Sequence, residues 1–361
     1  MINLIQKDDF RNFVSKRIAD STQKTYSFPS VFPPLYRYRS LSTYAIDDIL
    51  NSKITLTSIG EFNDIFDGAI HQYGSTEEIE KAAEAKWTEM ETLLNEAHLS
   101  EDILRRNDVV KPHIEHLKIE SRLRFRELDD LGTYVCCFSK DFRSTLMWAH
   151  YADSNKGLCI EYDFNNLPIS KGDLIRKSIF PVAYTSEPID VSDLMDEKGS
   201  QIYQYPIDAA VLCTALNKAS VWQYEQEWRI VWILASFLEK DQRMTINSLI
   251  LPSKLYFGYH FLRPFFCYNL NSDSERDKCN SIIKKFIELV SFIHENEIEA
   301  AVMAPSIGSY QLKPYDISAK NLYKFMLRHF HNKELNSIHC YYTIHDNLMD
   351  LLEKSEVETN V

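Results

Sequence analysis

The chain has 361 residues, 45% of them hydrophobic and 12% aromatic, which is enough apolar material for one large core or two modest ones. Its formal net charge of -12 disfavours a broad surface for holding duplex nucleic acid, although a localised acceptor site stays open. Only nine glycines occur, and neither G-x-G-x-x-G nor G-x-x-x-x-G-K-[ST] is present, which disfavours a phosphate site built on Gly-rich loops.

The apolar segments and the cysteines indicate the cellular compartment of the protein. No stretch approaches the roughly 18 apolar residues that span a bilayer, and the N-terminal residues contain no apolar core of signal-peptide length. The seven cysteines include no C-x-x-C pair and lie in core-like contexts such as YVCCFS. We therefore expect reduced, buried thiols in a cytoplasmic protein with no membrane association.

The N-terminal third predicts short alternating elements followed by a helical insertion. Residues 1–30 predict a helical segment that ends in the Pro-rich run SFPSVFPP. A strand (LYRYRS), a helix (TYAIDDILNS), a strand (KITLTS) and a loop rich in turn formers (EFNDIFDG) follow. Residues 77–130 are highly charged, contain no glycine and space their apolar residues as helices do. They predict an insertion of two or three helices outside the catalytic sheet, and the basic run SRLRFREL within it favours a solvated helix face over a nucleic-acid contact.

The rest of the chain predicts strands and helices in no regular alternation. Strands are expected at TYVCCFS, GLCIEYDF, FPVAYT, YEQEWRIVWILA, KLYFGYHF and IEAAVMAP, and helices at STLMWAHYAD, DAAVLCTALNKA and SERDKCNSIIKKFIELVSFIHEN. The tail from residue 317 predicts helix with a short strand-like CYYTI. Irregular alternation disfavours a doubly wound sheet and favours an α+β fold. We expect a core domain over residues 31–240 and an α/β extension over residues 241–361 packed on it.

The run WQYEQEWRIVW carries two acids at the same phase. In a strand Glu225 and Glu227 project from one face, and Trp228, Ile230 and Trp232 share the other. One interpretation is an exposed face, or an ion pair near the arginine that follows Trp228. The other is a catalytic carboxylate held on a rigid strand in a cleft walled by aromatic rings.

Three further groups could carry chemistry, each with a structural alternative. LYRYRS places Arg37 and a second arginine on one strand face, for phosphate binding or for a surface salt bridge. Trp148 and Tyr151 share a helix face, for core packing or for an aromatic clamp on a planar ring. Asn63, Asp64 and Asp67 offer oxygen ligands for Mg²⁺ or Ca²⁺, or an Asx-turn. The late histidines (His329, His331, His339 and His345) match no standard zinc spacing.

In this order the motifs resemble a bacterial family known as domain of unknown function 2971. Its pattern runs L-Y-[KRH]-Y, F-N-D-P-F-D, C-F-S, M-W-x-x-Y-x-x-x-x-x-G and E-x-E-W-R. The corresponding runs here are LYRY, FNDIFD, CFS, MWAHYADSNKG and EQEWR, within about residues 35–235. Ile65 departs from the pattern, which usually has proline at that position.

A more distant resemblance is to ADP-ribosyltransferases, and it implies a split mixed or antiparallel sheet core. LYRYRS followed by ILNSKI is similar to their first motif, CFS with GLCIE to their second, and EWRIVW to their third. The resemblance implies that Glu227 takes the place of the catalytic glutamate, with Glu225 two residues before it. It also implies that NAD contacts a set of residues from the first two motifs, namely Arg37, Ser40, Phe138, Ser139, Trp148 and Tyr151. Arg37, Tyr151 and Glu227 are then expected to line one cleft.

The function implied by this resemblance uses NAD as a substrate and no metal. The enzyme would cleave the nicotinamide–ribose bond, where positive charge develops on the sugar, and transfer ADP-ribose to a protein or nucleic acid or to water. The expected setting is a bacterial toxin or phage-defence effector, with a partner protein from the same operon. Two alternatives stay open: a non-catalytic nucleotide-binding sensor, and a metal-dependent nuclease that uses Asn63, Asp64 and Asp67.

Overall fold

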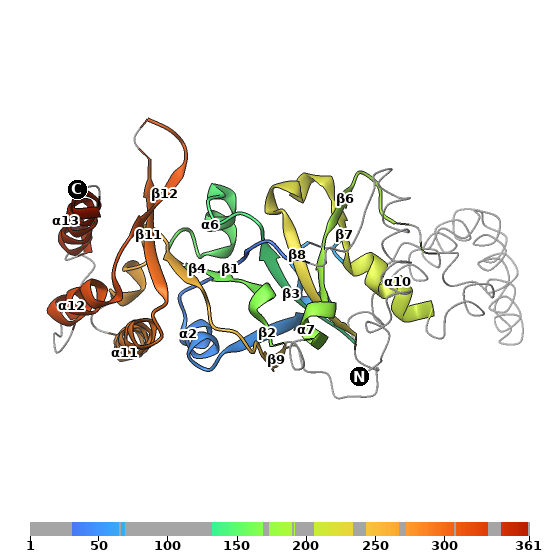
Figure 1. The fold of residues 1–361 in the computed structure, drawn as a ribbon, viewed down its shortest axis with the longest axis horizontal. Helices are drawn as coiled ribbons and strands as arrows, with labels where there is room; N and C mark the ends of the chain where they lie inside the picture. Colours follow the sequence, from blue (N-terminus) through green and yellow to red (C-terminus); the bar gives the residue numbers. More distant parts are fainter. Residues whose placement is uncertain are drawn as a thin grey trace, which may run out of the picture.

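The computed structural model describes residues 31–64, 66–68, 132–168, 173–189, 191, 206–233, 243–266, 272–306, 308–330 and 341–359. The predicted helices in residues 1–30 and 77–130 lie outside the described residues. The described part is a mixture of helices and a mostly antiparallel sheet (Figure 1), so the predicted α+β class is confirmed. No described helix combines the length and the apolar content that a membrane span needs.

The main sheet has ten strands, and a separate parallel pair lies beside it. The main strands are β1 (Leu35–Arg39), β2 (Lys53–Ser58), β3 (Thr133–Ser139), β4 (Leu158–Tyr162), β5 (Ile179–Pro181), β8 (Glu227–Ile233), β9 (Arg243–Asn247), β10 (Lys254–Phe257), β11 (Glu299–Pro305) and β12 (Leu312–Asp316). The pair is β6 (Ala183–Thr185) with β7 (Asn217–Ala219).

Seven described helices and four short 3-10 turns complete the architecture. The helices are α2 (Thr43–Leu50), α6 (Thr145–Tyr151), α7 (Asp173–Lys177), α10 (Pro206–Ala215), α11 (Asp273–Glu295), α12 (Ala319–Phe330) and α13 (Tyr341–Thr359). The 3-10 turns are η2 (Ile59–Glu61), η3 (Phe164–Asn166), η4 (Ser220–Glu225) and η5 (Arg263–Phe265).

Strand β3 is the point where the sheet divides. Strand β8 pairs with β3 along its whole length, from Thr133 to Ser139. The other edge of β3 is shared: β1 pairs with it at Ser139, and β2 pairs with it at Tyr134 and Val135. Between these two contacts β1 and β2 diverge, so the middle of β3 has an open edge between them.

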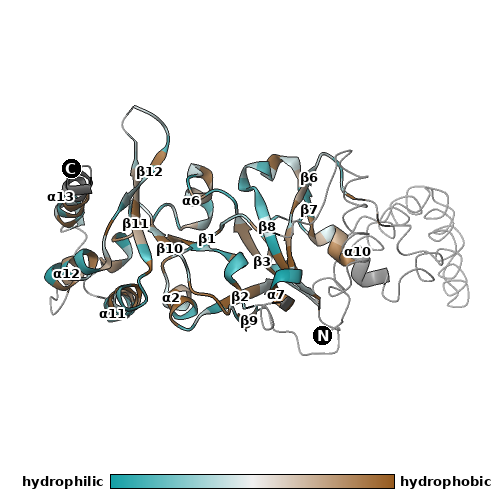
Figure 2. Cartoon of the chain, in the orientation of Figure 1, coloured by the Kyte–Doolittle hydropathy of each residue, from teal (hydrophilic) through white to brown (hydrophobic). Residues whose placement is uncertain are grey.

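The strands bury both faces, in agreement with period two. On one face Leu255, Phe257 and Val302 join the core under α2, α11 and α12. On the other, Tyr256 and Ala301 pack with α6. A third cluster joins α10 to β3, β5 and β8. Figure 2 shows α11 and α12 with hydrophilic and hydrophobic residues interleaved, as expected for helices with one buried side.

Most short elements fall where the sequence predicts them, but several predictions are wrong. The helix predicted at DAAVLCTALNKA ends at Ala215, and its last three residues form β7. The predicted long strand at YEQEWRIVWILA begins only at Glu227, because η4 ends at Glu225 and Gln226 adopts a left-handed conformation with φ 44°. The run FPVAYT is broken into β5 and β6 around Val182, whose N–H donates to the carbonyl of Glu227. The strand-like CYYTI begins α13, where Tyr341 is buried.

The loop after α6 sets the position of that helix. Asp153, Ser154 and Asn155 all have left-handed backbone angles, with φ 48°, 56° and 65°. Gly157 follows them and lies so close to β1 that a Cβ there would be 2.1 Å from the carbonyl oxygen of Arg39. Such a distance requires glycine, so this loop holds α6 against β1 and β4.

We predict that Gly157→Ala lowers the free energy of unfolding by about 3 kcal/mol, because backbone atoms on two sides would have to move. Gly308→Ala is the control: its φ of +79° strains an L-residue, but apart from its chain neighbours no atom of the described residues lies within 4 Å of the added Cβ, so a loss of about 1 kcal/mol is expected. Denaturant unfolding measures both. Equal losses of unfolding free energy in the two variants would show that the close approach at Gly157 does not contribute to stability.

Candidate functional site

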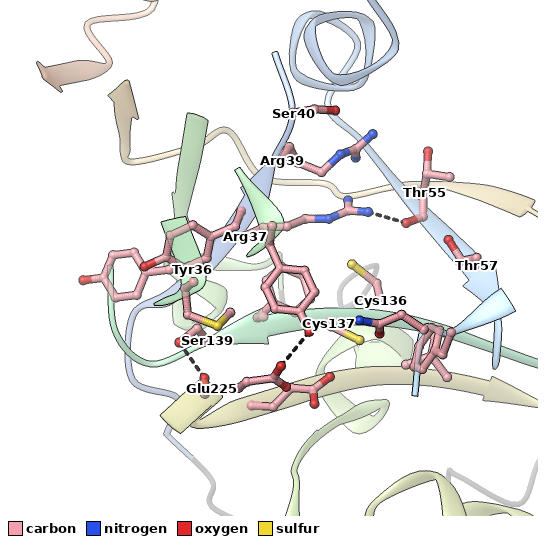
Figure 3. A pocket seen from close by; sticks show the side chains of 18 of the residues that line it. Tyr36, Arg37, Arg39, Ser40, Thr55, Thr57, Cys136, Cys137, Ser139 and Glu225 are labelled. Carbon is pink, nitrogen blue, oxygen red and sulfur yellow. Dashed lines mark hydrogen bonds between the residues drawn. The ribbon is translucent and has the colours of Figure 1, made fainter. Parts of the chain in front are cut away.

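A pocket of about 510 Å³ lies where β1 and β2 diverge over β3. This volume is within the range of small-molecule sites. Figure 3 shows Arg37 and Arg39 approaching it from one side and Glu225 from the other. The pocket therefore has two walls of different chemistry.

The first wall is cationic. The Arg37 Nη2 donates to the carbonyl oxygen of Thr55 at 2.6 Å, which links β1 to β2 across the opening. The Arg39 Nη1 donates to Asp48 Oδ2 at 3.0 Å, and Asp48 also accepts from the Thr55 hydroxyl. Burial, together with the charge of Arg37, lowers the pKa of Arg39. Arg37 is 9% exposed and makes one hydrogen bond to the described residues, so most of its five donors stay available to an anion.

The second wall is a buried cluster of charges. Arg229, with no exposed area, donates to both oxygens of Asp67 at 2.7 and 2.6 Å and to both oxygens of Glu227 at 2.9 and 3.0 Å. The Lys218 Nζ lies 2.6 Å from Glu225 Oε2, 3.1 Å from Glu227 Oε2 and 3.3 Å from Asp67 Oδ2. Three carboxylates and two cations leave this cluster one negative charge in excess.

The two glutamates differ in how much hydrogen-bonding capacity they have left. A carboxylate offers about four acceptor positions. Glu227 uses three of them, on N–H donors from Arg229 and Lys218. Glu225 uses two, one on the Tyr151 hydroxyl at 2.6 Å and one on Lys218. Of the two glutamates, Glu225 therefore has more capacity left to accept from a ligand.

The pKa values of the two glutamates are displaced in opposite directions. Burial by itself raises the pKa of Glu227, but Arg229 and Lys218 outweigh it and hold that pKa at about 2. Burial, reinforced by the charge of Glu227 and opposed by Lys218, raises the pKa of Glu225. Burial and Glu225 also raise the pKa of Tyr151, which keeps its hydroxyl a neutral donor.

Backbone contacts hold Glu225 and Glu227 side by side although they do not share a strand face. The Ser139 hydroxyl donates to the carbonyl of Glu225 at 2.7 Å and accepts from the N–H of Asp141. The N–H of Glu227 donates to the Tyr184 hydroxyl at 2.8 Å. The left-handed Gln226 turns the chain between them, so both side chains reach Lys218.

Most of the residues predicted for the site are in the pocket lining. The pocket brings together Arg37, Ser40, Asn63, Asp67, Phe138, Ser139, Tyr151, Glu225 and Glu227. Arg37, Tyr151 and Glu227 thus line one pocket, as their order in the chain predicts, although Glu227 pairs with Arg229 and Lys218 and not with Arg37.

Trp148 and Asp64 are not in the lining. Trp148 is fully buried, meets Tyr38 edge to face at a ring distance of 5.3 Å, and donates from Nε1 to the carbonyl of Phe142. A clamp of Trp148 with Tyr151 is therefore not assembled. The Asp64 Oδ1 accepts from the N–H of Phe66, which is the Asx-turn contact.

No pattern in the sequence indicates Lys218, Asp48 or Thr55 as site residues. Lys218 falls at the end of a predicted helix, but it occupies β7 in the structure. Asp48 and Thr55 contact the arginines through the packing of α2 on β2, which no local pattern reveals.

Among the described residues, no group of three or more His, Cys, Asp and Glu side chains could hold a metal ion. Asp67, which the nuclease interpretation requires, already has both oxygens bound by Arg229. A cation at that position would have to displace a buried guanidinium.

Comparison with known proteins finds one family match, over part of the chain. Residues 147–230 match the model of the family described as "Protein of unknown function (DUF2971)", which confirms the predicted resemblance for this segment. The segment runs from α6 into β8 and contains Tyr151, Lys218, Glu225, Glu227 and Arg229. No curated protein and no solved structure matches the chain.

We predict that Arg229→Met lowers the free energy of unfolding by about 3–5 kcal/mol at neutral pH, because it leaves Asp67 and Glu227 buried with fewer partners. Glu227 has a folded pKa of about 2 against an ordinary 4.5, so its stabilising contribution is complete above pH 4.5 and is lost as the pH falls toward 2. Denaturant unfolding across this pH range should show a flatter profile in the variant.

The double variant Asp67→Asn with Arg229→Met is the charge-matched control, and it should recover part of the lost stability. A loss under about 1 kcal/mol in the single variant would contradict a role for the ion pairs in the fold.

Proposed function

We propose that this protein binds NAD in the pocket between β1, β2 and β3 and cleaves its nicotinamide–ribose bond. ADP-ribose is transferred to a macromolecular acceptor, or to water. One observation carries the proposal: a single pocket joins an arginine wall to a buried carboxylate cluster with one negative charge in excess.

The two walls suit the charge distribution of NAD. Its pyrophosphate is anionic, and the fork of donors on Arg37, with Arg39 two residues on, matches phosphate oxygens. Its nicotinamide ring is cationic, and bond cleavage moves positive charge onto the ribose. A fixed carboxylate beside that sugar stabilises the charge as it develops, and stabilises it best in a site that excludes water.

We assign the residue that faces the reacting sugar by its free acceptor positions. Glu225 keeps two, whereas Glu227, which the ADP-ribosyltransferase resemblance puts in the catalytic place, keeps one and is held by two cations. The displaced pKa values support the same division: the group with the raised pKa exchanges protons, and the group with the lowered pKa stays ionised. Glu227 then orients Arg229 and Lys218.

The proposed step balances without a metal or a redox partner. The bond between ribose C1′ and the ring nitrogen breaks, and its electron pair neutralises the nicotinamide ring. A lone pair of the acceptor oxygen or nitrogen forms the new bond to C1′, and the acceptor proton passes to Glu225.

The divergence of β1 and β2 over β3 supports a split-sheet core like that of ADP-ribosyltransferases. A bacterial toxin or phage-defence effector in the cytoplasm, with an operon partner, remains the proposed setting on the strength of the sequence resemblance.

A second candidate is a non-catalytic nucleotide sensor. It is favoured by the pairing of Glu227 with both Arg229 and Lys218 and by the low exposure of both glutamates, at 2% for Glu225 and 5% for Glu227. Such a protein would bind NAD through the same arginines without breaking it.

We predict that Glu225→Gln reduces the rate of NAD consumption by about 10²–10³, the loss typical of one pre-organised electrostatic group. The change keeps the size of the side chain and removes its charge. The assay uses labelled NAD with bacterial lysate and follows label into protein, RNA, DNA and free ADP-ribose. Glu161→Gln is the matched control, because Glu161 is outside the pocket lining and bonds Tyr256 and Ser253.

Turnover in Glu225→Gln equal to that of the wild type would contradict the mechanism. If the wild type consumes no NAD with any lysate but NAD raises its melting temperature, the sensor function replaces the catalytic one.

A further inference from the structure

Lys218 occupies a position in the pocket that neither the family pattern nor the proposed chemistry accounts for. It comes from the short strand β7, and its side chain is 6% exposed. Its Nζ contacts Glu225, Glu227 and Asp67, which belong to three separate elements. The ring of Trp222 covers it at 5.2 Å.

These contacts decide what Lys218 can do. Two of its three N–H donors bond Glu225 and Glu227, and its Nζ also pairs with Asp67 at 3.3 Å. Lys218 is thus surrounded by carboxylates, and we expect it to act on the reaction through them.

The geometry points to Lys218 as a positioning residue: it is the counter-ion on which the charge and orientation of Glu225 depend. This inference deepens the proposed function and rests on it for its catalytic meaning, although the dependence of Glu225 on Lys218 can be measured without catalysis.

The dependence follows from an unequal sharing of cations. Glu227 and Asp67 each contact Lys218 and also Arg229. Glu225 contacts Lys218 alone among the described cations. Removal of Lys218 therefore leaves Glu227 with a guanidinium and Glu225 with only the neutral hydroxyl of Tyr151.

The other groups around the cluster cannot replace the missing charge. Within the described residues, those facing it are Asp67 from the loop after η2, Cys137 from β3, Tyr151 from α6, Tyr184 from β6, Glu225 from η4, and Glu227 and Arg229 from β8. Arg229 is the one cation among them, and its Nε and both Nη atoms are donating to Asp67, Glu227 and the carbonyl of Ala215. Glu225 without Lys218 is thus a buried carboxylate beside the negative Glu227.

The site also calls for lysine in preference to arginine. Lysine is a compact charge whose three donors can point to three different elements, whereas the guanidinium of arginine is a planar fork. Lys218→Arg should therefore keep the charge but lose part of the geometry, and Lys218→Met should lose both.

The test is a pH titration of the glutamate carboxyl groups by carbon-13 NMR in the full-length chain without NAD. The signals are assigned by their loss in Glu225→Gln and Glu227→Gln. In Lys218→Met we expect the Glu225 midpoint to rise by about one pH unit or more, a tenfold change in proton affinity. The Glu227 midpoint should move less, because Arg229 remains. Lys218→Arg should give an intermediate Glu225 midpoint.

Lys156→Met is the control, because Lys156 pairs with Asp153 outside the pocket, and it should leave both midpoints unchanged. If Lys218→Met does not fold, as judged by circular dichroism, the Lys218→Arg titration decides. A Glu225 midpoint unchanged from wild type in the folded variants, or equal shifts of the two glutamates, would overturn the inference.

The pH profile of NAD consumption then separates this inference from the proposed function. If Glu225 takes the acceptor proton, its protonation slows turnover at low pH, and in Lys218→Met this loss should begin at a higher pH. A wild type without turnover would remove the catalytic function, while the NMR titration would still decide the role of Lys218. A normal wild-type rate with an unmoved Glu225 midpoint would remove the role of Lys218 alone.

Discussion

The fold and the site both depend on the buried guanidinium of Arg229. It binds Asp67 and Glu227 through both oxygens of each, and its Nη1 also donates to the carbonyl of Ala215. Burying an unpaired charge costs several kcal/mol, so each of these groups requires the others to be in place. The loop after η2, the end of α10 and the start of β8 are thereby joined at one point. Asp67 and Glu227, which meet at that point, line the pocket.

The pocket opens at the edge of β3 that β1 and β2 share. Because β8 occupies one edge of β3 completely, β1 and β2 have to share the other, and they separate between Ser139 and Val135. The Arg37 side chain crosses the gap to the carbonyl of Thr55, which places a cation opposite the carboxylates. Separation of charge across one pocket is therefore a consequence of strand pairing.

Local patterns in the sequence predict most of the helices and strands, but they carry no information on which strands pair. Period two identified β1 and β2, and helical spacing identified α11. The order of the motifs, through the ADP-ribosyltransferase resemblance, predicted that Arg37 shares a cleft with Tyr151 and Glu227. The prediction that Glu225 and Glu227 share one strand face is wrong, because Gln226 between them adopts a left-handed conformation. Gln226 is not a glycine, so nothing in the composition indicates this conformation. Lys218 was missed because a two-strand pair as short as β6 with β7 carries no periodicity to detect. Trp148 has the helical spacing expected of an aromatic clamp with Tyr151, but its side chain is buried in the core against Tyr38.

The central claim, that the pocket takes a pyrophosphate at its arginine wall, is tested most directly by calorimetric titration of the purified chain with NAD and with ADP-ribose. Both ligands should bind at one site per chain. Arg37→Met should weaken both by about 10–100-fold, since a hydrogen bond to a charged group contributes about 1.5–3 kcal/mol. No heat of binding from either ligand in the wild type, or equal affinities in wild type and Arg37→Met, would contradict the account.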